Sequence, residues 1–286
     1  MKALLRHISR FLLILMVGGL LAATLVRYAP GFDVDEQQMD SRLSSESIQA
    51  LRAAKTGEHN VLQFYCSFLR SAFRGDFGMS RTLNRPVKEL VGERLPVTMK
   101  LIGTGLLVGW SIALIFAISA TMVRFAAYDV FTTFISGLLL CIPSAVLALA
   151  FVFANAPGSI ALGLMVFAHV FRYWRNLLEK SYAMPHIITA RAKGLGPARI
   201  LLFHILPVSG GQLLAVAGVS VSLALGAAIP VEALCGIPGI GQLAWQAALG
   251  RDLSLLLTLT FLVTVVTLLA NSISEILGSN FGAQEA

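Results

Sequence analysis

Long stretches of apolar residues without a charged side chain alternate with short charged segments along this chain. The five strongest stretches cover residues 11–26, 101–123, 130–154, 205–231 and 253–274. A helix needs about 20 predominantly apolar residues to cross the hydrocarbon core of a bilayer, and flanking Arg side chains can extend a short stretch by snorkelling. None of the stretches alternates residue by residue, as the strands of a membrane barrel do. The pattern therefore predicts membrane-spanning helices at these five positions.

A sixth, weaker apolar stretch covers residues 156–171. Gly158 and Gly163 weaken it as a helix, and it ends at Arg172. The charge distribution nevertheless favours a sixth span, because basic segments beside apolar stretches face the cytoplasm and six spans put both termini and both basic segments there. We therefore expect an all-α membrane protein, a polytopic bundle of six transmembrane helices with both termini cytoplasmic.

Composition and charge exclude several other classes of protein. Hydrophobic residues make up 56% of the 286 residues and charged residues only 13%, well below the share in soluble domains. The formal net charge of +7 is concentrated in residues 1–10 and 172–199, whereas residues 29–95 carry as many acidic as basic side chains. Two short basic segments between apolar stretches are typical of a cytoplasmic membrane face. We expect a lipid environment and no nucleic-acid partner.

The N-terminal third divides into a span and a segment outside the membrane. We interpret residues 1–28 as the N-terminal transmembrane helix; a cleaved signal peptide is the alternative, but no small-x-small cleavage site precedes Arg27. Residues 29–95 then form an extracytoplasmic segment. Within it, apolar side chains recur at helical spacing and predict an amphipathic helix over 60–73: Val61, Phe64, Tyr65, Phe68, Leu69 and Ala72.

No motif in the sequence predicts catalysis or a bound cofactor. The chain lacks a Gly-x-x-x-x-Gly-Lys-Ser/Thr phosphate loop, a His-Glu-x-x-His metal motif, cysteine pairs at metal spacing and a Gly-x-Ser-x-Gly nucleophile motif. The four strongest spans also lack Asp, Glu, Lys and Arg, the residues on which ion-coupled transporters usually build their ion sites. We expect a protein that is not an enzyme, and whose energy for any transport comes from another chain.

The segment 172–207 predicts a compact helix–turn–helix. Residues 186–193 favour a helix, Gly194 and Gly196 can end it in a left-handed cap, and Pro197 can begin a second short helix that runs to a break before Pro207. Its basic side is formed by three residues: Arg191, Lys193 and Arg199. An ordinary basic loop would explain the charge but not the compact turn.

This segment also carries a resemblance to a known family. Residues 189–195 have the sequence Thr-Ala-Arg-Ala-Lys-Gly-Leu, and Leu206-Pro207 follow twelve residues after Gly194. This resembles the EAA coupling loop of the permeases of ABC importers, and more narrowly the dipeptide/oligopeptide/nickel permease family. Further matches in the family's order are Gly75-Asp76-Phe77-Gly78-Met79-Ser80, Arg85-Pro86-Val87, Glu93-Arg94-Leu95-Pro96-Val97-Thr98, Ile142-Pro143-Ser144, Arg175, Glu232-Ala233-Leu234, Gly236-Ile237-Pro238-Gly239-Ile240-Gly241 and Arg251-Asp252.

The chain departs from the family pattern at four places. Ile188 stands where the Glu of the EAA motif would be, and Pro185-His186 replace a common Asp-Tyr. The connection at Asn155–Ser159 is shortened, which puts the substrate gate in doubt. Gly278-Ser279-Asn280-Phe281 replace the usual Leu-Asp-Pro-Arg and leave the end of the last span in doubt.

The resemblance implies a domain plan, a location and a set of partners. Residues 96–280 would be the permease transmembrane domain of five helices with a coupling loop at 176–207, and 281–286 a C-terminal tail. The implied protein is a permease subunit in a bacterial inner membrane that forms half of a pathway for peptides or a related small solute such as a nickel chelate. Its partners would be two cytoplasmic ABC ATPases, a second related permease subunit and an extracytoplasmic substrate-binding protein, with ATP and magnesium held by the ATPases and no cofactor in this chain.

The resemblance also implies two groups of site residues. The ATPase-coupling group lies in residues 186–207 and comprises Thr189, Ala190, Arg191, Ala192, Lys193, Gly194, Leu195, Arg199, Leu206 and Pro207. The family-motif or gating group comprises Gly75, Asp76, Gly78, Arg94, Pro96, Pro143, Gly236, Pro238, Gly239, Gly241 and Asp252. Small residues around Gly194 would let the loop seat in a partner's groove, and its cations would meet carboxylates at the rim.

Two other classes remain open at the level of the sequence: an ion-coupled secondary transporter, and a membrane scaffold or enzyme that does not transport. An importer subunit purifies with ATPase chains and a second permease, whereas a carrier or an enzyme purifies alone. No residue of the spans distinguishes one substrate from another.

The topology yields a testable expectation. In a background without the three native cysteines, cysteines placed at Ser44 and Ala198 should react with an impermeant thiol reagent from opposite sides of the membrane, because the basic asymmetry puts 29–95 outside and 172–207 inside. Labelling of both sites from one side would contradict six spans.

Overall fold

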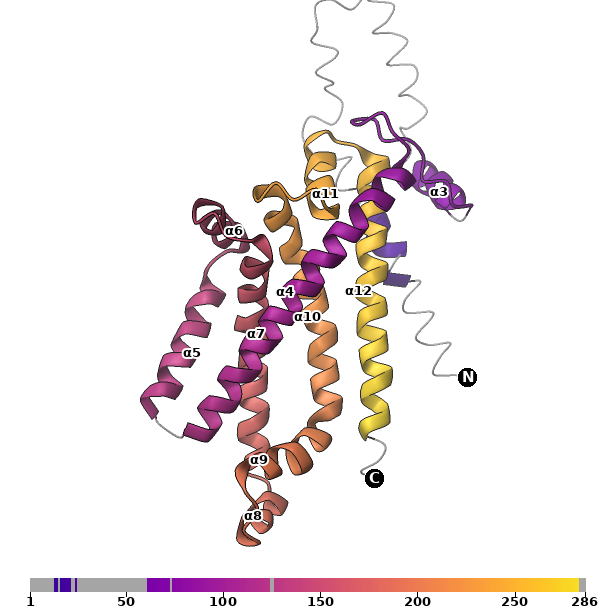
Figure 1. Cartoon of the computed structure of the whole chain (residues 1–286). Coiled ribbons are helices and arrows are strands. Elements are labelled where there is room, and N and C mark those ends of the chain that lie inside the picture. Colours follow the sequence, from indigo (N-terminus) through magenta and orange to yellow (C-terminus); the bar gives the residue numbers. More distant parts are fainter. Residues whose placement is uncertain are drawn as a thin grey trace, which may run out of the picture. The chain divides into compact units, whose positions relative to one another are not determined.

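The computed structural model describes residues 13–14, 16–21, 24, 61–72, 74–123 and 126–282. These residues are almost entirely helical and include no β-strand, only an isolated bridge between Met79 and Pro86 (Figure 1). The elements are α3 Val61–Ala72, α4 Val87–Val123, α5 Ala126–Cys141, α6 Ser144–Phe153, α7 Gly158–Tyr182, α8 Pro185–Ala192, α9 Pro197–Ile200, the π-helix η2 Leu201–Ile205, α10 Leu206–Leu234, α11 Ile240–Leu249 and α12 Leu253–Gly282. The expected all-α class holds throughout the described part of the chain.

The chain forms two compact units, and α4, α11 and α12 each contribute to both. The first unit comprises Met1–Glu93 and Leu243–Val265, and the second comprises Arg94–Gln242 and Val266–Ala286. In the first unit, α3 lies where the helical periodicity predicts it. Two of its aromatic residues are buried and stack on Phe261 of α12, with ring centroids 6.3 Å away for Tyr65 and 5.8 Å for Phe68.

Helix α7 carries the apolar core of the second unit. Its side chains Leu162, Phe171 and Leu178 are fully buried, and α5, α6 and α10 pack against it. Trp174 on α7 meets Trp110 on α4 edge to face, with ring centroids 6.2 Å apart. A single helix thus organises this unit, although its sequence predicted the weakest of the spans.

The backbones of α4 and α7 approach each other at glycines. A Cβ atom at Gly109 would lie 2.6 Å from the carbonyl oxygen of Gly163 and 2.8 Å from Cβ of Val166, closer than any side chain tolerates. A second such approach joins α10 to α12, where a Cβ at Gly211 would lie 2.9 Å from the carbonyl oxygen of Gly278. Close contact at small residues is typical of helix packing in membranes, where hydrophobic burial does not drive association.

Three helical segments in the described residues are long and apolar enough to cross a membrane: Val87–Ala120, Pro197–Leu234 and Leu253–Gly278. They include the runs predicted at 205–231 and 253–274 in full, and the run predicted at 101–123 as far as Ala120. Helix α7 is continuous over 25 residues and passes through Arg172 and Arg175. Seven of the 16 residues of the run at 11–26 fall outside the described residues, so the count of six spans stays a prediction.

The expectation of one unbroken helix over 130–154 is wrong, although its two parts together are apolar and long enough to cross a membrane. Helices α5 and α6 cover this run but meet at a bend of 99°. Pro143 stands at the break with an extended conformation (ψ 140°) and lacks the N–H that a continuous helix requires. The mean hydropathy of the run does not depend on the direction of the chain, so it does not reveal this bend.

The predicted break before Pro207 is also wrong. The chain runs from α9 through the π-helix η2 into α10 without interruption, and Pro207 is the second residue of α10. The N–H of Leu206 donates to the carbonyl of Leu201, five residues earlier, so the hydrogen-bond register widens by one residue just before the proline. The wider turn admits the proline ring without ending the helix.

The close approach of α4 and α7 predicts a sensitive position. Gly109→Ala should lower the free energy of unfolding by about 1–3 kcal/mol, because the added methyl group displaces the α7 backbone. The midpoint of SDS-induced unfolding in mixed micelles measures the loss. Gly103→Ala is the matched control on the same helix, since a Cβ there meets no atom within 4 Å, and it should leave the midpoint unchanged. Equal midpoints for the two variants would contradict the contact.

Candidate functional site

The segment from α8 to η2 forms a tight helix–turn–helix at one end of α7 and α10, opposite the end that carries α6 (Figure 1). Helix α8 begins with Pro185 at its first position and ends before Gly194, whose φ of +78° is the left-handed conformation predicted for it. The N–H of Gly194 donates to the carbonyl of Arg191 and that of Leu195 to the carbonyl of Ala190, at 2.9 and 3.3 Å. Pro197 then starts α9, so a turn of a few residues reverses the chain.

One side of this segment is anchored in the core of the second unit. Ile187, Ala190, Ile200 and Ile205 are buried there, with exposed fractions of 4% or less. The predicted coupling residue Ala190 therefore contacts the chain's own core, and its methyl group is not on the outer surface. Leu195 and Leu206 are half-buried against the same core.

The other side combines positive charge with large apolar side chains. Arg191, Lys193 and Arg199 are exposed, and the guanidinium of Arg191 lies 5.2 Å from the centre of the Tyr182 ring, a cation–π distance. Beside them, Ile188 and Phe203 are 60% and 70% exposed. The remaining predicted coupling residues are exposed too: Thr189, Ala192, Gly194 and Pro207. We call this surface the coupling face; charge interspersed with exposed apolar area suits a protein partner.

At the far end of α10, a buried carboxylate organises the Gly-rich motif after the helix. Glu232 is fully buried and accepts hydrogen bonds from the hydroxyl of Thr98 at 2.7 Å and from the N–H groups of Gly241 and Gln242 at 2.6 and 3.2 Å. The Thr98 hydroxyl also accepts the N–H of Ile240 at 2.7 Å. The carboxylate therefore satisfies the first amides of α11, which a helix leaves without partners.

Several predicted gating residues belong to this same structure. Arg94 donates to the side-chain oxygen of Gln242 at 3.0 Å, and Gly236 adopts a φ of +67°. A side chain at Gly239 would collide with the Glu232 carboxylate. Pro96 lies inside α4 and Pro238 is exposed. These residues shape a turn and a helix start, and sequence reasoning had not placed Glu232 or Thr98 among the site residues, although both fall inside the matched motifs.

The other predicted gating residues, apart from Pro143 at the break between α5 and α6, shape a second turn, in the first unit. Asp252 is fully buried, accepts the Ser80 hydroxyl at 2.6 Å and the Thr82 N–H at 3.2 Å, and caps α12 through the N–H of Leu255 at 3.1 Å. The loop before Ser80 turns at Gly75 and Gly78, with φ values of +79° and +75°, and the Gly78 N–H donates to Asp76. This group therefore serves local structure.

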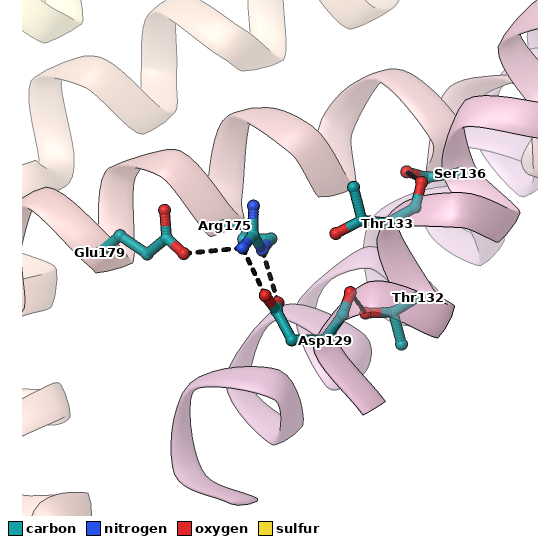
Figure 2. A network of polar contacts seen from close by, with 6 residues as sticks. All are labelled: Asp129, Thr132, Thr133, Ser136, Arg175 and Glu179. Carbon is teal, nitrogen blue, oxygen red and sulfur yellow. Dashed lines mark hydrogen bonds and ion pairs between the residues drawn. The ribbon is translucent and has the colours of Figure 1, made fainter. Parts of the chain in front are cut away.

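No group of three or more His, Cys, Asp or Glu residues in the described part of the chain lies close enough to hold a metal ion. In the second unit, Asp129 of α5 and Arg175 of α7 form an ion pair that Glu179 extends (Figure 2). The family resemblance marked Arg175, but nothing in the sequence signalled Asp129 as its partner, because the two residues are 46 positions apart.

Comparisons with known proteins agree on one family. Residues 105–283 match the model of the family described as binding-protein-dependent transport system inner membrane component. The oligopeptide transport system permease protein OppB of Salmonella typhimurium is 29% identical over 260 residues, which cover 84% of this chain and 84% of that protein. The OppB protein of Escherichia coli K12 is 28% identical with the same coverage.

A solved structure shares the fold. An inward-facing structure of the MetNI methionine ABC transporter superposes with a TM-score of 0.52 and covers 66% of this chain and 96% of the matched chain, at 16% sequence identity.

The Glu232 network predicts a large structural effect. Glu232→Ala should lower the free energy of unfolding by about 3 kcal/mol, because two buried donors and one partly buried donor lose their acceptor, and each buried one costs about 1–3 kcal/mol. Glu89→Ala is the control, since Glu89 is 53% exposed in its ion pair with Arg85 and such pairs contribute about 0–1 kcal/mol. Unfolding midpoints in mixed micelles measure both changes. Comparable small shifts would show that the buried carboxylate is not the support of the turn.

Proposed function

Because the chain belongs to the family of binding-protein-dependent transport system inner membrane components, and is thereby an inner-membrane permease of an ABC importer, we propose that it forms half of a translocation pathway for peptides. Cytoplasmic ATPases would drive the transport by docking on residues 186–207. The observation that carries the proposal is the coupling face. This compact turn is anchored on one side and exposes cations and large apolar side chains on the other. Such a surface is suited to tight binding by a partner protein.

The anchoring explains how such a grip would act on the pathway. Helix α7 ends at Tyr182 just before α8, and α9 continues through η2 into α10, so both helices that flank the segment are joined to it. The hydroxyls of Ser181 on α7 and Ser209 on α10 also lie 3.3 Å apart. Closure of ATP-loaded partners would therefore displace the segment together with the ends of α7 and α10, and rock these helices between inward-open and outward-open arrangements.

The partners follow from the same proposal. Two ABC ATPases would hold ATP and magnesium, a second related permease would complete the pathway, and an extracytoplasmic binding protein would deliver the substrate. The names of the OppB relatives support peptides as the substrate class, with nickel chelates as the alternative in the same family. Both termini would lie in the cytoplasm.

Gly194→Glu tests the docking site. The substitution forces a side chain into a left-handed conformation, at about 1–2 kcal/mol, and puts a negative charge in a basic surface. The variant should insert normally but lose at least ten-fold in the yield of ATPase that co-purifies with it, or in ATP hydrolysis by the assembled transporter.

Two controls separate the effect of the backbone conformation at Gly194 from the effect of the added negative charge. Gly196→Ala changes a glycine two residues away whose φ is −67° and whose Cβ would meet no atom within 4 Å, so the turn should keep its shape. Arg124→Glu introduces negative charge outside the segment. Both should assemble like the wild type, and wild-type assembly of Gly194→Glu would overturn the docking assignment.

A further inference from the structure

Helices α5 and α7 are joined by a two-pronged ion pair. The Arg175 Nε donates to Asp129 Oδ1 at 2.7 Å, and Nη2 donates to Oδ2 at 2.6 Å (Figure 2). The Arg175 side chain is 22% exposed and the Asp129 side chain 35% exposed, so water screens the pair only in part. A guanidinium fork on a carboxylate defines orientation as well as distance, which a single-point contact does not.

The rest of the α5–α7 contact is partly polar. The fully buried side chains of α5 are the hydroxyl residues Thr132 and Ser136, which donate to carbonyls of their own helix at 3.1 and 3.0 Å. Four large apolar side chains of α5 are 50–67% exposed (Val130, Phe131, Phe134 and Leu138), whereas Leu139 packs against the core. The buried Thr133 hydroxyl has no hydrogen-bond partner among the described residues. The apolar contact leaves the rotation and sliding of α5 on α7 less defined than a hydrogen bond does, so the two-pronged ion pair supplies a directional link between the two helices.

The ion pair lies between two parts that would move in the proposed importer: the end of α7 and the α5–α6 pair. On one side, Arg175 is one helical turn before Leu178, which is fully buried, and two turns before the end of α7. There α7 meets the helix–turn–helix from α8 to η2, which we call the coupling segment. On the other side, α5 leads through the break at Pro143 into α6, which packs against α10 and α7. A displacement of the end of α7 therefore reaches the α5–α6 pair through Arg175 and Asp129.

A second carboxylate gives Arg175 an alternative partner. Its Nη2 also contacts Glu179 Oε1 at 2.8 Å, one turn along the same helix, where the Glu179 side chain is 54% exposed. If Asp129 moves away, the guanidinium stays paired, so separation of the two helices does not leave an isolated charge. The Glu179 contact lies within α7 and cannot itself hold α5.

We propose that the Arg175–Asp129 ion pair is a positioning element that passes movement of the coupling segment to α5 and α6. The proposal rests on the proposed importer function, since it needs ATPases that move the segment. Arg175 and Asp129 are positioning residues here; neither needs to contact the substrate.

The movement of α5 can be measured without knowing the substrate. Spin labels on cysteines at Leu138 of α5 and Val219 of α10, both exposed, report the distance between these helices in a background without the native cysteines. In the complete transporter with its ATPase subunits, magnesium and a non-hydrolysable ATP analogue should shift this distance. Asp129→Asn should reduce the shift at least two-fold while the ATPases still co-purify.

Three further variants make the test specific. Arg175→Lys keeps the charge but loses the fork and should also reduce the shift. The exchanged pair Asp129→Arg/Arg175→Asp, made with Glu179→Gln to avoid repulsion, should restore it. Glu179→Gln alone removes only the contact within α7 and should behave like the wild type.

Each outcome decides between the two proposals. Absence of a nucleotide-dependent shift in the wild type would overturn the proposed coupling, and this inference with it. A normal wild-type shift that persists in Asp129→Asn and Arg175→Lys would overturn this inference alone. Failure of all the pair variants to assemble would show a purely structural role and would overturn it as well.

Discussion

The contact on which the second unit depends is the approach of two backbones at Gly109 and Gly163. It brings α4 against α7, and α7 in turn supports α5, α6, α10 and the anchored side of the coupling segment. In lipid there is no hydrophobic force to press helices together, so the attraction comes from close van der Waals contact, which any side chain at these glycines would prevent. Because the packing around α7 is close, a displacement of the end of α7 would be transmitted to the other helices of the unit.

Polar groups are used in two different ways in the described part of the chain. Glu232 and Asp252 are fully buried, and their carboxylate oxygens accept hydrogen bonds from backbone amides and hydroxyls. Each therefore holds a turn and a helix start in one arrangement. Arg175 is only partly buried and is shared between Asp129 and Glu179. A saturated buried carboxylate resists change, whereas a shared, partly hydrated guanidinium tolerates it. The fold thus combines immobile turns with one polar link that is able to rearrange.

The sequence predicted the coupling segment in detail because its geometry is local. The left-handed conformation of Gly194 and the helix start at Pro197 depend on the residues themselves, and both are as expected. The helical periodicity over 60–73 and the long apolar runs near α10 and α12 are local signals as well. The two prolines behave differently: the helix breaks at Pro143 with a bend of 99°, whereas it continues through a π turn at Pro207, where a break was expected.

By itself the sequence determined the class of protein, the apolar lengths that suit a bilayer, the family and the exposed cations of the coupling face, since these depend on composition and on neighbours along the chain. Only the tertiary structure decided that Ala190 lies in the core while Ile188 and Phe203 are exposed, that Glu232 serves the start of α11, and that Asp129 meets Arg175. Each of these requires residues far apart in the chain to meet. That meeting is set by how the helices cross, and helix crossing depends on the shapes of two surfaces at once, which no single stretch of sequence contains.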